Sequence, residues 1–128
     1  MKLRIEYQLK EKYLDVVIEG IYDLPEAKTL LIETIDYAIQ HNQDRILVDY
    51  RNIEGGATLT QSFDYVTFLV TQFREKINEN GISGMRMAYV GRDPMGKFGE
   101  MVATNRGVAG KYTTDVNEAI EWLSAEES

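Results

Sequence analysis

The chain has 128 residues, with 14 Lys and Arg against 21 Asp and Glu, and a formal net charge of −7. This length is typical of one domain, and we expect a single domain over residues 1–128. The chain has no Cys and a single His, His41. That composition excludes a disulfide scaffold, a thiolate zinc site and a multi-histidine site, so we expect neither a metal nor a cofactor.

Charge and hydropathy narrow the class of protein further. No apolar run reaches the roughly 18 residues that suggest a transmembrane helix, and the alternating, acid-containing residues 2–6 do not resemble a signal peptide. The acidic balance argues against a nucleic-acid-binding protein, whose contact face would be basic. We therefore expect a soluble, cytoplasmic protein.

Two strands and a helix are predicted at the start of the chain. Residues 2–9 alternate between apolar and polar side chains, and residues 13–22 are rich in β-branched and aromatic side chains. The short turn between them favours an antiparallel hairpin. An amphipathic helix follows, with Pro25 in its first turn, and runs to about His41; Asp23 is expected to accept a hydrogen bond from a free N–H of this helix.

The middle of the chain alternates between apolar strands and a long helix. Short apolar runs predict buried strands over 45–50 and 85–90, and the glycine-containing residues 52–57 predict a loop. Apolar residues spaced by three and four predict a helix over 59–80. The expected core-facing residues of this helix are Leu59, Phe63, Val66, Val70, Phe73 and Ile77.

The last third of the chain continues the alternation. After a loop over 91–96, a third helix is predicted over 98–105, a short strand over 110–113, and a last helix over 116–123 that Asp115 caps. The resulting order is ββαβαβαβα. It predicts an α/β fold with a mixed, mostly parallel sheet of about five strands and four helices.

This order resembles the STAS domain, the fold of bacterial anti-sigma-factor antagonists and of the cytosolic tails of sulphate transporters. The resemblance is carried by Ile46-Leu47-Val48-Asp49, the aromatic helix start near Phe63, and residues 98–123, which include Asn105-Arg106-Gly107. It is closer to small stand-alone STAS-like proteins, whose fold is also likened to CRAL-TRIO lipid-binding domains. Much of that branch has no defined function, so the resemblance implies a fold and little chemistry.

The chain departs from the phospho-regulated STAS proteins at one motif. Those proteins carry a phosphorylated serine in an Asp-Ser-Ser-Gly type turn before the second helix, whereas residues 54–60 here read Glu-Gly-Gly-Ala-Thr-Leu-Thr. Thr58 and Thr60 are the hydroxyls available in this stretch. Thr58 has two readings, a phosphorylation site that contacts a partner, or the first residue of a capping box with Gln61.

Two aromatic residues of the long helix are candidates for partner binding. Tyr65 and Phe68 lie off the predicted core stripe, on flanking or opposite faces of the helix. Exposed rings on a polar face suggest a surface for a protein partner or the wall of an apolar pocket. The alternative is a helix that is buried on two sides, which would absorb both rings.

Residues 86–111 form the one basic segment, with a formal net charge of +3 in a chain of −7. Arg92, Lys97 and Arg106 are candidate ligands for an anion such as a phosphate head group. The alternative for Arg92 and Lys97 is an ordinary solvated surface. The alternative for Arg106 is that a basic residue complements the dipole at the end of a helix.

These features favour a non-catalytic module that docks a protein partner over an enzyme, because no nucleophile and base, metal set or cofactor loop is visible. The alternative function is a carrier or sensor of a small apolar or anionic ligand such as a lipid. A homodimer is a further expectation, formed through the aromatic residues of the long helix.

Overall fold

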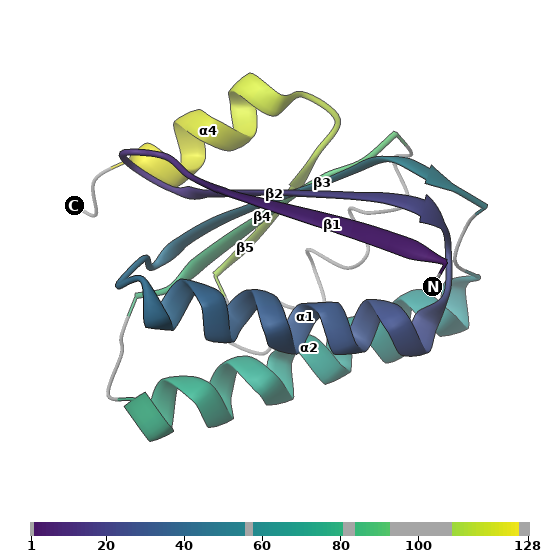
Figure 1. The fold of residues 1–128 in the computed structure, drawn as a ribbon, viewed down its shortest axis with the longest axis horizontal. Coiled ribbons are helices and arrows are strands. Elements are labelled where there is room, and N and C mark those ends of the chain that lie inside the picture. Colours follow the sequence, from purple (N-terminus) through teal and green to yellow (C-terminus); the bar gives the residue numbers. More distant parts are fainter. Residues whose placement is uncertain (1, 56–57, 81–83, 93–108, 126–128) are drawn as a thin grey trace.

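The structure, a computed structural model, describes residues 2–55, 58–80, 84–92 and 109–125 (Figure 1). Its elements are β1 (Leu3–Leu9), β2 (Leu14–Ile21), α1 (Leu24–Gln40), β3 (Arg45–Glu54), α2 (Leu59–Asn80), β4 (Arg86–Val90), β5 (Gly110–Thr113) and α4 (Val116–Ser124). The predicted alternation of strands and helices is confirmed. The third helix, predicted over 98–105, lies outside the described residues.

β1 and β2 form the antiparallel hairpin that the sequence predicts, with Leu3 opposite Gly20. The Lys10 N–H closes the turn by donating to the Tyr13 carbonyl at 2.9 Å. At the other end of the hairpin the strands approach so closely that a Cβ on Gly20, whose φ is +127°, would lie 2.1 Å from the Lys2 carbonyl oxygen. Only glycine tolerates both this contact and this backbone conformation.

The five strands make one mixed, mostly parallel sheet in the order β1-β2-β3-β4-β5, as predicted. β2, β3, β4 and β5 run parallel to one another, and β1 runs antiparallel to β2. α1 connects β2 to β3 and α2 connects β3 to β4. Both helices cover one face of the sheet, and α4 lies on the opposite face (Figure 1).

Alternation along the central strands divides the core into two layers. Ile46 and Val48 of β3 pack toward α1 and α2, whereas Leu47 packs toward α4 with Leu123. Phe73 of α2 is 1% exposed in the larger layer. Truncating a buried aromatic side chain of this kind costs about 3–5 kcal/mol of stability.

One element is longer than the sequence predicts. The expected strand over 45–50 continues as β3 to Glu54, so residues 52–54 of the predicted loop are strand. The cause is the neighbouring β2, which pairs with β3 beyond an irregularity between Val17 and Glu19 and places Ile21 opposite Glu54. Backbone pairing to a neighbour therefore overrides the polar composition of this stretch.

The two predicted Asp caps have different outcomes. The Asp115 carboxylate accepts a hydrogen bond from the Asn117 N–H at 2.9 Å, which confirms the cap of α4. The prediction for Asp23 is wrong, because its side chain makes no capping hydrogen bond to α1. Its carboxyl lies next to the Glu26 carboxyl instead, and sharing of a proton between the two raises the pKa of Asp23 and lowers that of Glu26.

Candidate functional site

The start of α2 carries the capping box that was one of the two readings of Thr58. The Gln61 N–H donates to the Thr58 hydroxyl oxygen at 3.1 Å, and the Thr58 N–H donates to the Gln61 side-chain oxygen at 3.0 Å. This reciprocal pair satisfies two N–H groups that the first turn of a helix leaves free. The role of Thr58 in binding a partner stays a prediction.

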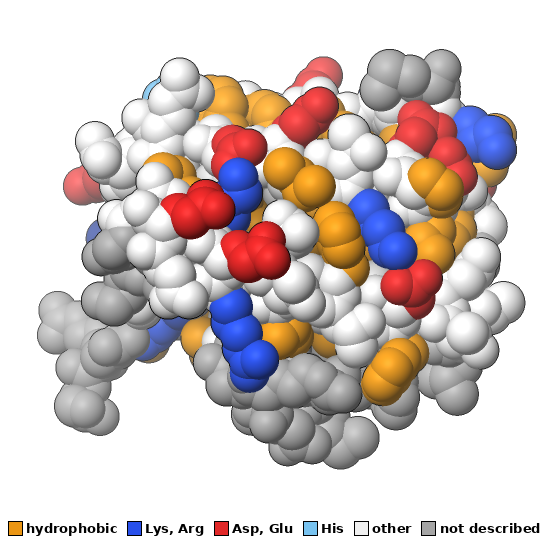
Figure 2. Space-filling view, turned by 90° about the horizontal axis from the view of Figure 1, so that it is seen from below, with side chains coloured by type: hydrophobic (Ala, Val, Ile, Leu, Met, Phe, Trp, Pro, Cys, Tyr) orange, Lys and Arg blue, Asp and Glu red, His pale blue; other side chains and the backbone are white. Residues whose placement is uncertain are grey.

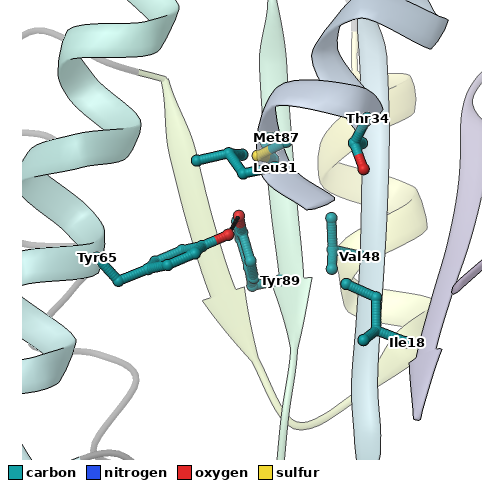
Figure 3. A pocket seen from close by; sticks show the side chains of 7 residues that line it. All are labelled: Ile18, Leu31, Thr34, Val48, Tyr65, Met87 and Tyr89. Carbon is teal, nitrogen blue, oxygen red and sulfur yellow. Dashed lines mark hydrogen bonds between the residues drawn. The ribbon is translucent and has the colours of Figure 1, made fainter. Parts of the chain in front are cut away.

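The sequence suggested that Tyr65 lies on an outer face of α2, but the structure places it inside. Its ring packs against the core between α2 and the sheet. Its hydroxyl lies 2.5 Å from the hydroxyl of Tyr89 on β4, and the two rings meet edge to face with centroids 6.1 Å apart (Figure 3). Burial raises the pKa of both phenols, because a phenolate loses its hydration in the core.

Phe68 is also half-buried rather than exposed, because α2 packs against α1 as well as against the sheet. Its ring joins the border of the core, and the Lys28 ammonium of α1 lies 5.3 Å from the ring centroid. The same ammonium donates to the Asp64 carboxylate at 3.0 Å. The helix is therefore buried on two sides, the alternative that the sequence left open for both rings.

Phe63 differs from the prediction in the opposite direction: it was expected in the core and lies at the surface. The sequence placed it on the core stripe, yet 43% of its surface is exposed. The inward face of α2 is instead centred on Leu69, Val70 and Phe73, which are all buried. No spacing rule distinguishes these alternatives, because the helix carries apolar residues around more than half of its circumference.

Three threonines line up with Phe63 along α2, bordered by the charged residues Asp64 and Arg74. We call Thr60, Phe63, Thr67 and Thr71 the threonine face; they recur at the helical spacings of three and four. The Thr67 hydroxyl donates to the Phe63 carbonyl at 3.0 Å, and the Thr71 hydroxyl donates to the Thr67 carbonyl at 3.1 Å. The hydroxyls of Thr67 and Thr71 therefore bond to carbonyl groups of the helix itself.

Two ion pairs join α1 to α2. Lys76 of α2 donates to Asp36 of α1 at 2.8 Å, in addition to the pair between Lys28 and Asp64. Figure 2 shows this side of the molecule, where basic and acidic side chains lie next to each other with hydrophobic side chains between them. Such exposed pairs contribute little stability, about 0–1 kcal/mol each. They do fix how the two helices lie against each other.

A cluster of tyrosines that the sequence analysis missed lies at the carboxyl end of the parallel strands. The Tyr50 ring centroid is 6.0 Å from that of Tyr89 and 6.4 Å from that of Tyr112. A Cβ on Gly91 would lie 2.7 Å from the Tyr112 hydroxyl and 2.8 Å from the Tyr50 hydroxyl. Gly91 therefore gives these rings their space. The sequence feature that could have indicated this cluster is a tyrosine in the second half of each of three predicted strands: Tyr50, Tyr89 and Tyr112.

The predicted anion site is only partly within the described residues. Arg92 donates through Nη2 to the Ile53 carbonyl at 2.5 Å, so it links the end of β4 to the end of β3. Lys97 and Arg106 lie outside the described residues. The described residues therefore do not test whether the three candidate ligands come together, and their role stays a prediction.

The cavity between α1, α2 and the sheet is small. It has a volume of about 10 Å³ and is lined by Ile18, Leu31, Thr34, Val48, Tyr65, Met87 and Tyr89 (Figure 3). That volume corresponds to roughly one water molecule. A lipid chain does not fit there, so this cavity gives the carrier hypothesis no support.

The part of the chain that the structure describes contains neither a candidate metal site nor a candidate membrane-spanning helix. No group of three or more His, Asp or Glu side chains there is placed to hold a metal ion. No helix among the same residues combines the length and the apolar character needed to cross a membrane. His41 is occupied at the end of α1, where its ring Nδ1 lies 2.8 Å from the Tyr37 carbonyl oxygen.

Comparison with solved structures identifies the fold. An anti-sigma factor antagonist from Mycobacterium paratuberculosis matches with a TM-score of 0.64 and 11% sequence identity, over 96% of this chain and 95% of that chain. An uncharacterized protein of the DUF3478 family from Shewanella loihica PV-4, described as having a SpoIIAA-like fold, matches with a TM-score of 0.54 and 17% identity, over 94% of this chain and 93% of the other. No family model and no curated protein matches the sequence. The chain thus has a STAS-like fold, as its resemblance to that family implied.

Proposed function

We propose that this protein is a non-catalytic module that docks a protein partner through the threonine face of α2. The observation that carries the proposal is the exposed Phe63 ring beside the threonines of this face. Asp64 and Arg74 border this face, and the Asp64 carboxylate is paired with Lys28 of α1. Interface centres combine aromatic side chains with a depletion of charge, so this face has the composition of a docking surface.

The fold is compatible with this role. The Mycobacterium protein of the same fold is described as an antagonist of an anti-sigma factor, which is itself a protein. By analogy, we infer a regulatory protein as the class of partner. The composition supports the absence of catalysis, because the chain has no Cys and its one His is His41.

The proposal changes which residues of α2 carry the docking. Tyr65 and Phe68 were the candidates from the sequence, but both pack against the core. A substitution of Tyr65 would disturb the hydrogen bond to Tyr89 and confuse binding with stability. Phe63 is the better probe because its ring is exposed, and Thr58 stays a candidate contact at the start of the same helix.

The test compares two matched substitutions. Phe63→Glu places a charge on the threonine face, and Ile21→Glu places a charge on an apolar side chain of β2 that is 56% exposed. Tagged proteins are used to capture partners from cells of the source organism, and retained proteins are identified by mass spectrometry. We expect one stoichiometric protein with the wild type and with Ile21→Glu, and its loss with Phe63→Glu.

The folding of each variant is checked by its thermal unfolding midpoint. Unchanged midpoints with selective loss for Phe63→Glu support the proposal. The docking proposal is wrong if the wild type retains no protein. It is also wrong if Phe63→Glu retains the same protein as strongly as Ile21→Glu does.

A further inference from the structure

β1 is an edge strand whose outer side offers a regular row of backbone groups. It pairs with β2 on one side, and no strand of the described residues lies beside it on the other. The Lys2 carbonyl and the Lys10 N–H both bond toward β2. Alternation in an antiparallel ladder then turns the N–H and C=O groups of the odd-numbered residues outward. The Leu3 N–H points outward and donates to Glu26 of α1 at 3.4 Å, so a strand added along this edge replaces that bond at Leu3.

We propose that β1 pairs with β1 of a second copy of this chain, in antiparallel register around a twofold axis at Ile5. Ile5 then lies opposite Ile5 of the second copy, and Leu3 lies opposite Tyr7 of the second copy. The two sheets become one continuous sheet. This interface uses β1, whereas the docking proposal uses the threonine face of α2. Each of the two proposals can therefore be tested without the other.

Charge complementarity selects this register. Arg4 lies opposite Glu6 of the second copy, and by symmetry Glu6 lies opposite its Arg4. Moving the axis by one residue toward either end of the strand would place Glu6 opposite Glu6 or Arg4 opposite Arg4, and like charges directly opposite each other are destabilising. Arg4 already lies 3.5 Å from Glu19 of β2. In the pair it would sit between two carboxylates.

The opposite face of the same pair is apolar. Ile5 lies opposite Ile18 of β2, so the twofold axis would create a row of four isoleucines across both copies. Ile5 and Tyr7 are half-buried and border the core, and the Tyr7 ring stacks on Tyr37 of α1 at 4.4 Å. A second copy would cover the remaining surface of these side chains, which favours association.

The edge also lacks the features that usually prevent such pairing. Long edge strands are commonly protected by charges of one sign, by proline or by a bulge. β1 contains no proline, and the irregularity in the sheet lies between Val17 and Glu19 against β3. Its charges, Arg4 and Glu6, have opposite signs two residues apart, an arrangement that attracts a second antiparallel copy.

The first test uses charge reversal and sedimentation velocity at increasing protein concentration. Arg4→Glu and Glu6→Arg each turn both cross-strand pairs into like-charge pairs, so each variant alone should dimerise roughly 10- to 100-fold more weakly than the wild type. A mixture of the two variants restores both pairs between unlike chains and should recover the dimer. Glu121→Arg, an exposed site on α4, should dimerise as the wild type does.

The second test fixes the register by disulfide formation, which is clean because the chain has no Cys. Directly opposite residues that are not hydrogen-bonded have Cα atoms roughly 4.5 Å apart, within disulfide range. Arg4→Cys mixed with Glu6→Cys should form a mixed disulfide dimer rapidly, whereas either variant alone should not. The proposal is overturned if the wild type stays monomeric at all concentrations, if the reversed variants dimerise normally, or if Glu6→Cys alone crosslinks as fast as the mixture.

Discussion

The hydroxyl of Tyr65 on α2 lies 2.5 Å from the hydroxyl of Tyr89 on β4. This hydrogen bond joins a helix to the sheet across a layer that is otherwise apolar. Each phenol hydroxyl is hydrogen-bonded to the other, at a depth where an unpaired hydroxyl is costly. The pair therefore ties the first half of α2, and with it the threonine face, to the strands beneath.

The pair predicts non-additive effects on stability. Tyr65→Phe and Tyr89→Phe should each lower the free energy of unfolding by about 1–3 kcal/mol, because each leaves one buried hydroxyl without a partner. The double substitution should cost less than the sum of the two, since it removes both hydroxyls together. Urea unfolding of the four proteins in the cycle measures this coupling, and strict additivity would contradict it.

The same pair predicts how stability changes at alkaline pH. Burial raises the pKa of Tyr65 and Tyr89 above the ordinary value of 10.0, so the folded state holds protons that the unfolded state has released. Their contribution to stability is fully present below about pH 10 and is lost as pH rises toward the folded pKa values. Near-ultraviolet absorbance should show phenolates from these residues only as the protein unfolds. Their titration together with exposed tyrosines, in the folded protein, would rule this out.

The capping box predicts a local effect at the start of α2. Thr58→Ala removes the acceptor of the Gln61 N–H and should lower the free energy of unfolding by about 1 kcal/mol. Thr58→Ser keeps the hydroxyl and should stay close to the wild type. The measurement is the midpoint of urea unfolding at an unchanged slope. Equal effects of Ala and Ser would show that the hydroxyl does not act as the cap.

The close approach of β1 and β2 predicts a larger effect from a small side chain. Gly20→Ala introduces a Cβ where the Lys2 carbonyl oxygen lies 2.1 Å away, at a φ of +127°. The start of β1 must then move away from β2, and we expect a loss of about 1–3 kcal/mol in the free energy of unfolding. Amide hydrogen exchange should show the loss of protection first at Ile21, whose N–H donates to the Lys2 carbonyl. Wild-type stability of Gly20→Ala would contradict this account.

Features that depend on neighbours in the sequence were predicted correctly. The capping box of Thr58 and Gln61 and the cap of Asp115 rest on spacings of two or three residues, which a helix start converts into hydrogen bonds. The order of strands and helices follows from the periodicity of apolar side chains. Hydrophobic alternation and turn residues therefore specify the STAS-like fold even at the low sequence identity to its structural relatives.

Features that depend on packing between elements needed the tertiary structure. The sequence shows that α2 has apolar residues on several faces, but only its contacts with both the sheet and α1 decide that Tyr65 and Phe68 pack inward and Phe63 outward. The contact of Tyr65 with Tyr89 spans 24 residues of sequence, and β3 is extended by its pairing with β2. Periodicity determines which side chains share a face, whereas the direction of that face is decided by what the rest of the chain places against it.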